Sequence, residues 1–221
     1  MKKTGLLFAL IIMAIAVQSQ EIVNTFSKNI TVGFDVFNDI VTKSPADYNS
    51  RVINQGFSTF ATYNFKVGDS PHVFGIGAGI RTHNFYSDNI ITDVQADVIE
   101  FMPIGDSLTY KKSKLNLVYL DFPAEFRFHL NKDMKIGIGF KVGVLIDSKT
   151  KYVGQLVDEG ATSYIKEKKI NGLETISFGP TLRIGYKWIN VFAYYQPSKV
   201  FTAGKGPEFY PLSVGITIMP F

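Results

Sequence analysis

The residues best suited to acid–base chemistry are the histidines His72, His83 and His129. Ser87 and Asp88 follow His83 closely, so these three could supply the base, nucleophile and orienting acid of a lipid hydrolase or acyltransferase. Serine and aspartate are also ordinary loop residues, so their positions after His83 are explained equally well by a loop without catalytic function. We therefore predict no catalytic residues and a protein that is not an enzyme, with a lipid A-modifying enzyme as the less favoured alternative.

The sequence offers little for cofactor chemistry. It contains no cysteine, which excludes disulfides, thiolate metal ligands and thiol catalysis. The histidines and acidic residues do not have metal-site spacing. The stretch "GIGAG" (75–79) has neither the Gly-Lys-Ser/Thr nor the following helix of a phosphate-binding loop. We predict neither a metal nor a cofactor.

Charged residues instead alternate with apolar ones in "YLDFPAEFRF" (119–128). Asp121, Glu125 and Arg127 would each cost several kcal/mol to bury alone. A strand places successive side chains on opposite faces, so this segment has one apolar and one charged face. Turning the charged face to lipid would cost about 2–4 kcal/mol for a basic group near the bilayer midplane. The pattern predicts that the apolar face meets lipid and the charged face meets a confined interior.

The same alternation recurs along the chain and predicts eight strands. They are expected at about 29–38, 54–66, 72–84, 114–130, 135–146, 173–186, 191–197 and 211–221. Their connections alternate between tight turns and long loops, as the periplasmic turns and external loops of a membrane barrel do. The tight turns are 67–71, 131–134 and 187–190, and the long loops are 39–53, 85–113, 147–173 and 198–210. We predict an all-β fold, an eight-stranded antiparallel up-and-down transmembrane β-barrel.

The start of the chain has the features of a cleavable signal peptide. Lys2 and Lys3 precede an apolar run at 6–17, and small residues follow up to Ser19. The run is shorter than the ~20 residues that a spanning helix needs. We therefore expect a signal peptide at 1–19, a barrel at 20–221 and a location in the outer membrane.

An eight-stranded barrel is narrow enough for inward side chains to fill it, so its charges must pair with one another. We predict a structural polar network in the lumen. Its members are Asp35, Arg81, Asp121, Glu125, Arg127, Lys141 and Arg183. The tight turn at 131–134 places Glu125 near Gly139 and Lys141, which predicts a Glu125–Lys141 ion pair.

Two further contacts follow from strand pairing. The turn at 67–71 sets Phe60 opposite Gly79, a large residue over a small one as narrow barrels require. Pro123 cannot donate a hydrogen bond to a neighbouring strand, so we expect a bulge or bend there.

The chain resembles the PorT-like outer-membrane β-barrels of the Bacteroidetes type over nearly all of its exported length. The resemblance rests on the signal peptide, the eight strands, the Tyr-Leu-x-x-Pro pattern of Tyr119, Leu120 and Pro123, and the final "TIMPF". It implies that Phe221 is the signal read by the barrel-assembly machinery, although Pro220 departs from the usual pattern. One branch of this family serves protein secretion, so the resemblance also implies, as an alternative function, a component of a secretion or uptake complex.

The long loops are the expected place of function. Residues 85–113 are more apolar than a solvated loop requires, and 147–173 are rich in lysine. The lysines Lys149, Lys151, Lys166, Lys168 and Lys169 could contact lipopolysaccharide phosphates or an acidic partner. The net charge of +4 without a longer basic run gives no indication of nucleic-acid binding. We expect a non-enzymatic barrel with a closed lumen whose external loops serve binding, adhesion or a structural role.

Overall fold

The computed structural model describes residues 29–44, 48–157 and 160–219. The predicted signal peptide (1–19) and the proposed assembly signal Phe221 lie outside these described residues. Within them, no helix is long and apolar enough to span a bilayer.

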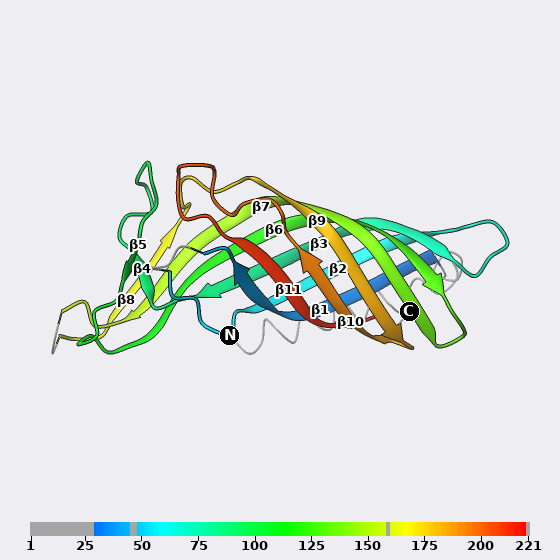
Figure 1. The fold of residues 1–221 in the computed structure, drawn as a ribbon, viewed down its shortest axis with the longest axis horizontal. Coiled ribbons are helices and arrows are strands. Elements are labelled where there is room, and N and C mark those ends of the chain that lie inside the picture. The colour runs from blue at the N-terminus through cyan, green and yellow to red at the C-terminus, as the bar shows by residue number, and fades with distance from the viewer. Residues whose placement is uncertain (1–28, 45–47, 158–159, 220–221) are drawn as a thin grey trace, which may run out of the picture.

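Eight long strands close into an antiparallel barrel (Figure 1). They are β1 (Ile30–Thr42), β2 (Gln55–Lys66), β3 (Val73–Tyr86), β6 (Tyr110–His129), β7 (Met134–Gly154), β9 (Ile176–Tyr186), β10 (Ile189–Tyr195) and β11 (Tyr210–Ile218). Each strand pairs with the next one in this series, and β1 pairs with β11 to complete the ring. The predicted fold class is confirmed.

Three short strands lie at the end of the barrel that carries the long connections. β4 (Asn89–Ile91) and β5 (Phe101–Pro103) form a hairpin, and β8 (Ser163–Lys168) pairs with the outer part of β7. Figure 1 shows them together at one end, with the tight turns at the other.

The long connections are more ordered than the sequence indicated. We expected loops over 85–113 and 147–173, and this was wrong in part, because β6 and β7 continue their pairing to Tyr110 and Gly154. Both faces of these extensions carry polar residues such as Lys112, Ser113 and Thr150, so the contrast between faces that reveals a membrane strand is missing there.

The register of the membrane part follows the predicted pairing. Phe60 lies opposite Gly79, and Glu125 lies opposite Gly139. The bulge expected at Pro123 was wrong, because Pro123 pairs in register with Lys141 on β7. Toward β3, the pairing is interrupted between Ala124 and Asp121 and resumes without a shift. The missing N–H of proline therefore opens a gap in the ladder but does not displace the strand.

The β6–β7 ladder shifts register instead at two other places, between Tyr110 and Lys112 and between Val118 and Tyr119. At the second of these, β7 contributes one residue more. The extra residue, Ile146, stands between Leu145, which pairs with Tyr119, and Asp147, which pairs with Val118. One inserted residue reverses which positions face outward. Beyond this bulge the odd-numbered residues of β7 therefore face outward.

The outer surface of the barrel is a broad apolar belt. Its exposed members include Phe34, Val36, Phe57, Phe65, Ile76, Ile80, Phe122, Ile138, Phe140, Ile176, Phe178, Ile184, Val191 and Ile216. A belt this large would be an aggregation surface in water and is the expected surface toward acyl chains. On β6 and β7 it ends at Val118 and Ile146, beyond which the next outward positions are polar or charged: Asn116 and Lys114 on β6, and Asp147, Lys149 and Lys151 on β7.

The interior is packed by rings that lie over glycines. Phe37 of β1 pairs with Gly56 of β2, and a Cβ added at Gly56 would lie 1.9 Å from the Phe37 ring. Similarly, a Cβ at Gly33 would lie 2.2 Å from Phe60. These glycines are required because the narrow lumen leaves no room for a side chain beside each ring.

We therefore predict that Gly56→Ala lowers the free energy of unfolding by roughly 1–3 kcal/mol, because it overpacks the lumen. The measurement is the midpoint of urea unfolding of the barrel in lipid vesicles. Gly105→Ala is the matched control, since its Cβ would meet nothing nearer than 3.9 Å. Equal midpoints for the two variants would contradict this account of the packing.

Candidate functional site

The lumen holds all seven residues of the predicted polar network. None exposes more than 5% of its surface. They lie in two groups along the barrel, and strand phase puts them there because every second residue of a barrel strand points inward. Nearer the tight turns is the turn-side cluster of Asp35, Glu125, Arg127 and Arg183. Nearer the long connections are the other three, Arg81, Asp121 and Lys141, which together with Asp39 and His83 form the external-side cluster.

The turn-side cluster is a continuous chain of ion pairs. Glu125 accepts hydrogen bonds from Arg127 Nε at 2.6 Å and from Arg183 Nη1 at 2.5 Å. Arg183 Nη2 reaches Asp35 Oδ1 at 3.2 Å, and the Thr217 hydroxyl donates to the same oxygen at 2.6 Å. Each carboxylate therefore has more than one donor, as buried ion pairs require.

The external-side cluster is centred on Arg81. Its guanidinium makes a bidentate ion pair with Asp121, in which Nε and Nη2 lie 2.8 Å and 3.0 Å from the two carboxylate oxygens. The rings of Tyr119 and Tyr194 each lie 4.7 Å from its central carbon. Lys141 Nζ lies 3.5 Å from Asp121 Oδ2. Planar, bidentate contact and ring stacking are features of arginine that a lysine at this position would lack.

The predicted Glu125–Lys141 ion pair was wrong. Lys141 lies opposite Pro123, so Asp121 and Glu125 are its two diagonal neighbours on β6. The structure pairs Lys141 with Asp121, because Glu125 is already held by Arg127 and by Arg183 from across the lumen. Our pairing rule considered only the adjacent strand. It therefore missed Arg183 of β9, which binds Glu125 in place of Lys141.

Sequence reasoning also missed Asp39 and the lumenal place of His83. His83 Nδ1 lies 2.7 Å from Asp39 Oδ2, and its Nε2 lies 2.7 Å from Arg81 Nη1. Since arginine can only donate, Nε2 accepts and Nδ1–H donates, which makes this histidine neutral. The signal for Asp39 was present, because it shares the inward face of β1 with Asp35 and Phe37.

His83, Ser87 and Asp88 do not form a catalytic triad. Both nitrogens of His83 are engaged by Asp39 and Arg81. The Ser87 hydroxyl donates to a backbone oxygen at 3.4 Å, and Asp88 accepts from Arg51 and from Tyr110. The nucleophile–base contact that such chemistry needs is therefore not made by these three residues.

The buried charges of the described lumen balance. Four carboxylates (Asp35, Asp39, Asp121 and Glu125) face four cations (Arg81, Arg127, Lys141 and Arg183), so the sum is zero with His83 neutral. Among the residues that the structure describes, no three His, Cys, Asp or Glu side chains are grouped as a metal ion requires. The lumen is thus a neutral, packed plug.

Above the belt, the long connections fold into one body, which we call the external crown. It consists of β4, β5, β8, the ends of β6 and β7 beyond Val118 and Ile146, and the segments 48–53, 92–100, 155–157, 169–175 and 198–209. Backbone hydrogen bonds join these segments, for example Ile99 N to Lys205 O at 2.8 Å and Asn171 N to Val94 O at 2.9 Å. They enclose an apolar core. Its buried members are Phe85, Ile91, Val94, Ile99, Leu115, Leu117, Tyr119, Ile170, Val200, Phe201 and Phe209.

The surroundings of Tyr48 show that the apolar core of the external crown excludes water. Its ring stacks on Phe209 at 5.5 Å and meets Phe101 edge-on at 5.2 Å. Burial raises the pKa of the Tyr48 phenol above its usual range, since an ionised phenolate would not be hydrated there.

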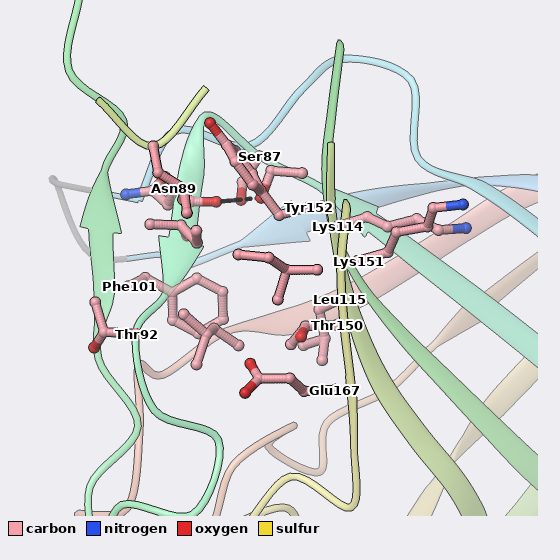
Figure 2. A pocket seen from close by; sticks show the side chains of 15 residues that line it. Ser87, Asn89, Thr92, Phe101, Lys114, Leu115, Thr150, Lys151, Tyr152 and Glu167 are labelled. Carbon is pink, nitrogen blue, oxygen red and sulfur yellow. Dashed lines mark hydrogen bonds between the residues drawn. The ribbon is translucent and has the colours of Figure 1, made fainter. Parts of the chain in front are cut away.

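A cavity of about 340 Å³ lies in the external crown between the β4–β5 hairpin and the sheet of β6, β7 and β8. Its apolar lining comes from Ile90, Ile91, Phe101, Leu115, Leu156 and Ile165. In Figure 2, Phe101, Tyr152 and Glu167 surround the cavity, whereas Lys114 and Lys151 extend to the opposite side of the sheet. The two faces of one sheet thus differ in chemistry, because neighbouring residues alternate between them.

Three of the hydroxyl groups around the cavity are bonded within the protein. Ser113 Oγ donates to Asn89 O at 2.5 Å, and the Tyr152 hydroxyl donates to Gln155 O at 2.6 Å. Ser87 Oγ donates to Asn89 O as well. These three groups are therefore not free to bind a ligand. The cavity presents mainly apolar surface, with the Glu167 carboxylate beside it.

Comparison with protein families matches residues 18–198 to the family described as outer membrane protein beta-barrel domain. No curated protein sequence matches the chain. Among solved structures, the chain is similar to Ail, the attachment invasion locus protein of Yersinia pestis, solved with the heparin analogue sucrose octasulfate. The identity is 12%, the TM-score 0.41, and the match covers 86% of this chain and 97% of Ail. A triple mutant of the Rhodopseudomonas blastica porin matches with 10% identity and a TM-score of 0.21, over 86% of this chain and 99% of the porin.

The plug generates a stability prediction. Glu125→Gln removes the carboxylate that neutralises Arg127 and Arg183, and leaving buried charge uncompensated costs roughly 3–5 kcal/mol. We expect the urea midpoint in vesicles to fall accordingly. Glu100→Gln, at an exposed crown position, should change the stability by no more than about 0.5 kcal/mol. If both variants unfolded like the wild type, the network would not stabilise the barrel.

Proposed function

Because this chain belongs to the outer membrane protein beta-barrel domain family, we propose that it is a non-enzymatic binding protein of the cell surface. The barrel anchors the protein in the outer membrane, and the external crown binds an apolar group of an external ligand. The observation that carries this proposal is the cavity of about 340 Å³ between the β4–β5 hairpin and the β6–β7–β8 sheet.

The closed lumen supports binding at the surface over passage through the barrel. Eight strands leave an interior that side chains fill. Here Arg81 lies between two tyrosine rings, and Arg183 lies against the rings of Phe60 and Phe192 at 4.7 and 5.4 Å. Moving a solute past these residues would require breaking buried ion pairs that neither water nor lipid can replace.

The cavity's chemistry indicates the kind of group that it takes. Its volume is at the lower end of the range for ligand pockets, which suits one ring or a short aliphatic chain. Phe101 and Tyr152 supply aromatic walls, and a carboxylate at Glu167 favours a ligand group that donates a hydrogen bond. An aromatic ring with one N–H fits these features.

A place in the PorT-like branch, and with it in a secretion or uptake complex, is the alternative. Apart from the sequence pattern around Pro123, it is supported by apolar side chains that are exposed in the external crown. Val52 is 89% exposed and Val157 is 65% exposed, although both lie outside the lipid-facing belt. Isolation from mildly solubilised outer membranes, with identification of what co-purifies, tests this alternative.

The proposal requires the external crown to lie outside the cell. The chain has no cysteine, so a single introduced thiol is specific. We expect a membrane-impermeant maleimide to label Tyr164→Cys on intact cells, because Tyr164 is 78% exposed in β8. Asn131→Cys, in the β6–β7 turn, should be labelled only after lysis. Labelling of Asn131→Cys but not Tyr164→Cys on intact cells would reverse the orientation.

Ligand binding is tested by filling the cavity. We expect 5-fluoroindole to bind the wild-type protein saturably in vesicles, as measured by fluorine NMR. Ile165→Trp should weaken this binding on the order of tenfold or more, since the new ring overlaps the probe. Tyr164→Trp is the matched control, because it adds the same ring to the other face of the same strand. Absence of saturable binding by the wild type, or equal binding by Ile165→Trp, would contradict the proposal.

A further inference from the structure

The outward face of the β6–β7–β8 sheet carries lysines in two cross-strand rows. Lys114 pairs with Lys151, which in turn pairs with Lys166. One step nearer the membrane, Lys149 lies between Asn116 and Lys168. We call these five lysines the lysine face. They share one face because partners and second neighbours in a sheet point the same way.

This arrangement is unfavourable for the isolated protein. Like charges directly opposite each other across strands are destabilising. The ladder places Lys114, Lys151 and Lys166 in such positions. Burial together with the charges of Lys112, Lys151 and Lys149 lowers the pKa of Lys114. Within the described sheet, the ion pair that neutralises part of this charge is Lys149 with Asp147, at 3.3 Å.

The height of the lysine face above the belt indicates its counter-charge. The rows of Lys149 and Lys151 stand two and four residues beyond Val118 on β6, the last apolar outward position. At 3.3–3.4 Å per residue along a strand tilted by 35–45°, they lie about 5 and 10 Å above the hydrocarbon. The headgroup region of a leaflet is about 5–8 Å thick. The inner row of Lys149 and Lys168 is therefore level with the phosphates of the outer leaflet. The outer row of Lys114, Lys151 and Lys166 lies just above them, within reach of a flexible lysine stem.

The five lysines lie on the outward face of the sheet, which continues the lipid-facing side of β6 and β7. On the opposite face of the same strands, Leu115, Tyr152 and Ile165 line the cavity. Figure 2 shows Lys114 and Lys151 projecting away from it. Lys114 and Lys151 are among the residues that line the cavity, but their side chains extend away from it, so the lysine face can be changed without filling the cavity.

We propose that the lysine face binds the phosphate groups of the outer-leaflet glycolipid, lipid A, and that this contact orients and stabilises the external crown above the bilayer. Asp147 is the carboxylate that the described part of this face offers to five lysines, and the lipid supplies the remaining anions. Aliphatic stems of the lysines extend the apolar belt while their ammonium groups reach the phosphates, as lysines at membrane interfaces do.

The test compares two triple variants of equal charge. Lys114→Gln, Lys151→Gln and Lys166→Gln together remove the outer row. Lys66→Gln, Lys132→Gln and Lys187→Gln together remove three lysines at the turn end of the barrel. The affinity for purified bis-phosphorylated lipid A, and for its dephosphorylated form, is measured by native mass spectrometry in a neutral detergent.

We expect a loss of roughly fivefold per lysine, on the order of a hundredfold for the outer-row variant, with little change for the turn-end variant. Dephosphorylated lipid A should bind weakly to all three proteins. Equal affinity of the outer-row variant and the wild type would overturn the proposal. Inorganic phosphate that competes fully at the same concentration as lipid A would also overturn it, because the site would then recognise a free anion.

A stability measurement separates lost binding from misfolding. In neutral detergent without lipid A, the outer-row variant should unfold at the same or a higher urea concentration than the wild type, since self-repulsion is relieved. Lipid A should then raise the midpoint of the wild type and the turn-end variant more than that of the outer-row variant. If the outer-row variant were less stable than the wild type in the absence of lipid A, the three lysines would stabilise the fold itself, and the proposal would be overturned.

Discussion

A narrow interior closed off from both water and lipid is the constraint from which the rest of this structure follows. Charged side chains enter that interior because strand phase directs every second residue inward. They are tolerated because four carboxylates meet four cations, with each contact supplemented by hydroxyl groups or aromatic rings. A single unmatched charge would lower the free energy of unfolding by more than most mutations do. No one of these charged residues can therefore be replaced by a neutral one without a compensating change in its partner.

The same two-residue alternation of side chains separates different surfaces inside the bilayer and above it. Within the bilayer it separates lipid-facing side chains from lumenal ones. Above the bulge at Ile146 it separates the lysine face from the walls of the cavity. The bulge matters because it changes which residues of β7 face outward at the level where the surrounding medium changes from hydrocarbon to headgroups. A barrel whose lumen is closed thereby presents two chemically distinct surfaces at the end that carries the long connections.

The external crown explains why the long connections of this chain are unusually apolar. Phe85, Ile99, Phe201 and Phe209 come from segments far apart in the sequence and pack into one core. A packed body of this kind holds its cavity in shape, which a set of solvated loops would not do. Its apolar residues could be recognised from composition, but their shared core could not, because no periodicity relates one loop to another.

The sequence by itself determined the alternation of inward and outward faces in the membrane strands, the pairing of Phe60 with Gly79 and the register across the tight turns at 67–71 and 131–134. These properties are local: side chains alternate with a period of two, and a short turn sets the register of the strands that it joins. The tertiary structure alone decided that Lys141 contacts Asp121, that Arg183 reaches Glu125 and Asp35, and that His83 is held by Asp39. Lys141 and Asp121 are diagonal neighbours on adjacent strands, whereas the other partners come from strands that are not neighbours in the sheet. The tilt and stagger of strands around the closed ring bring these residues together. Tilt and stagger belong to the whole barrel, and no single segment of the sequence specifies them.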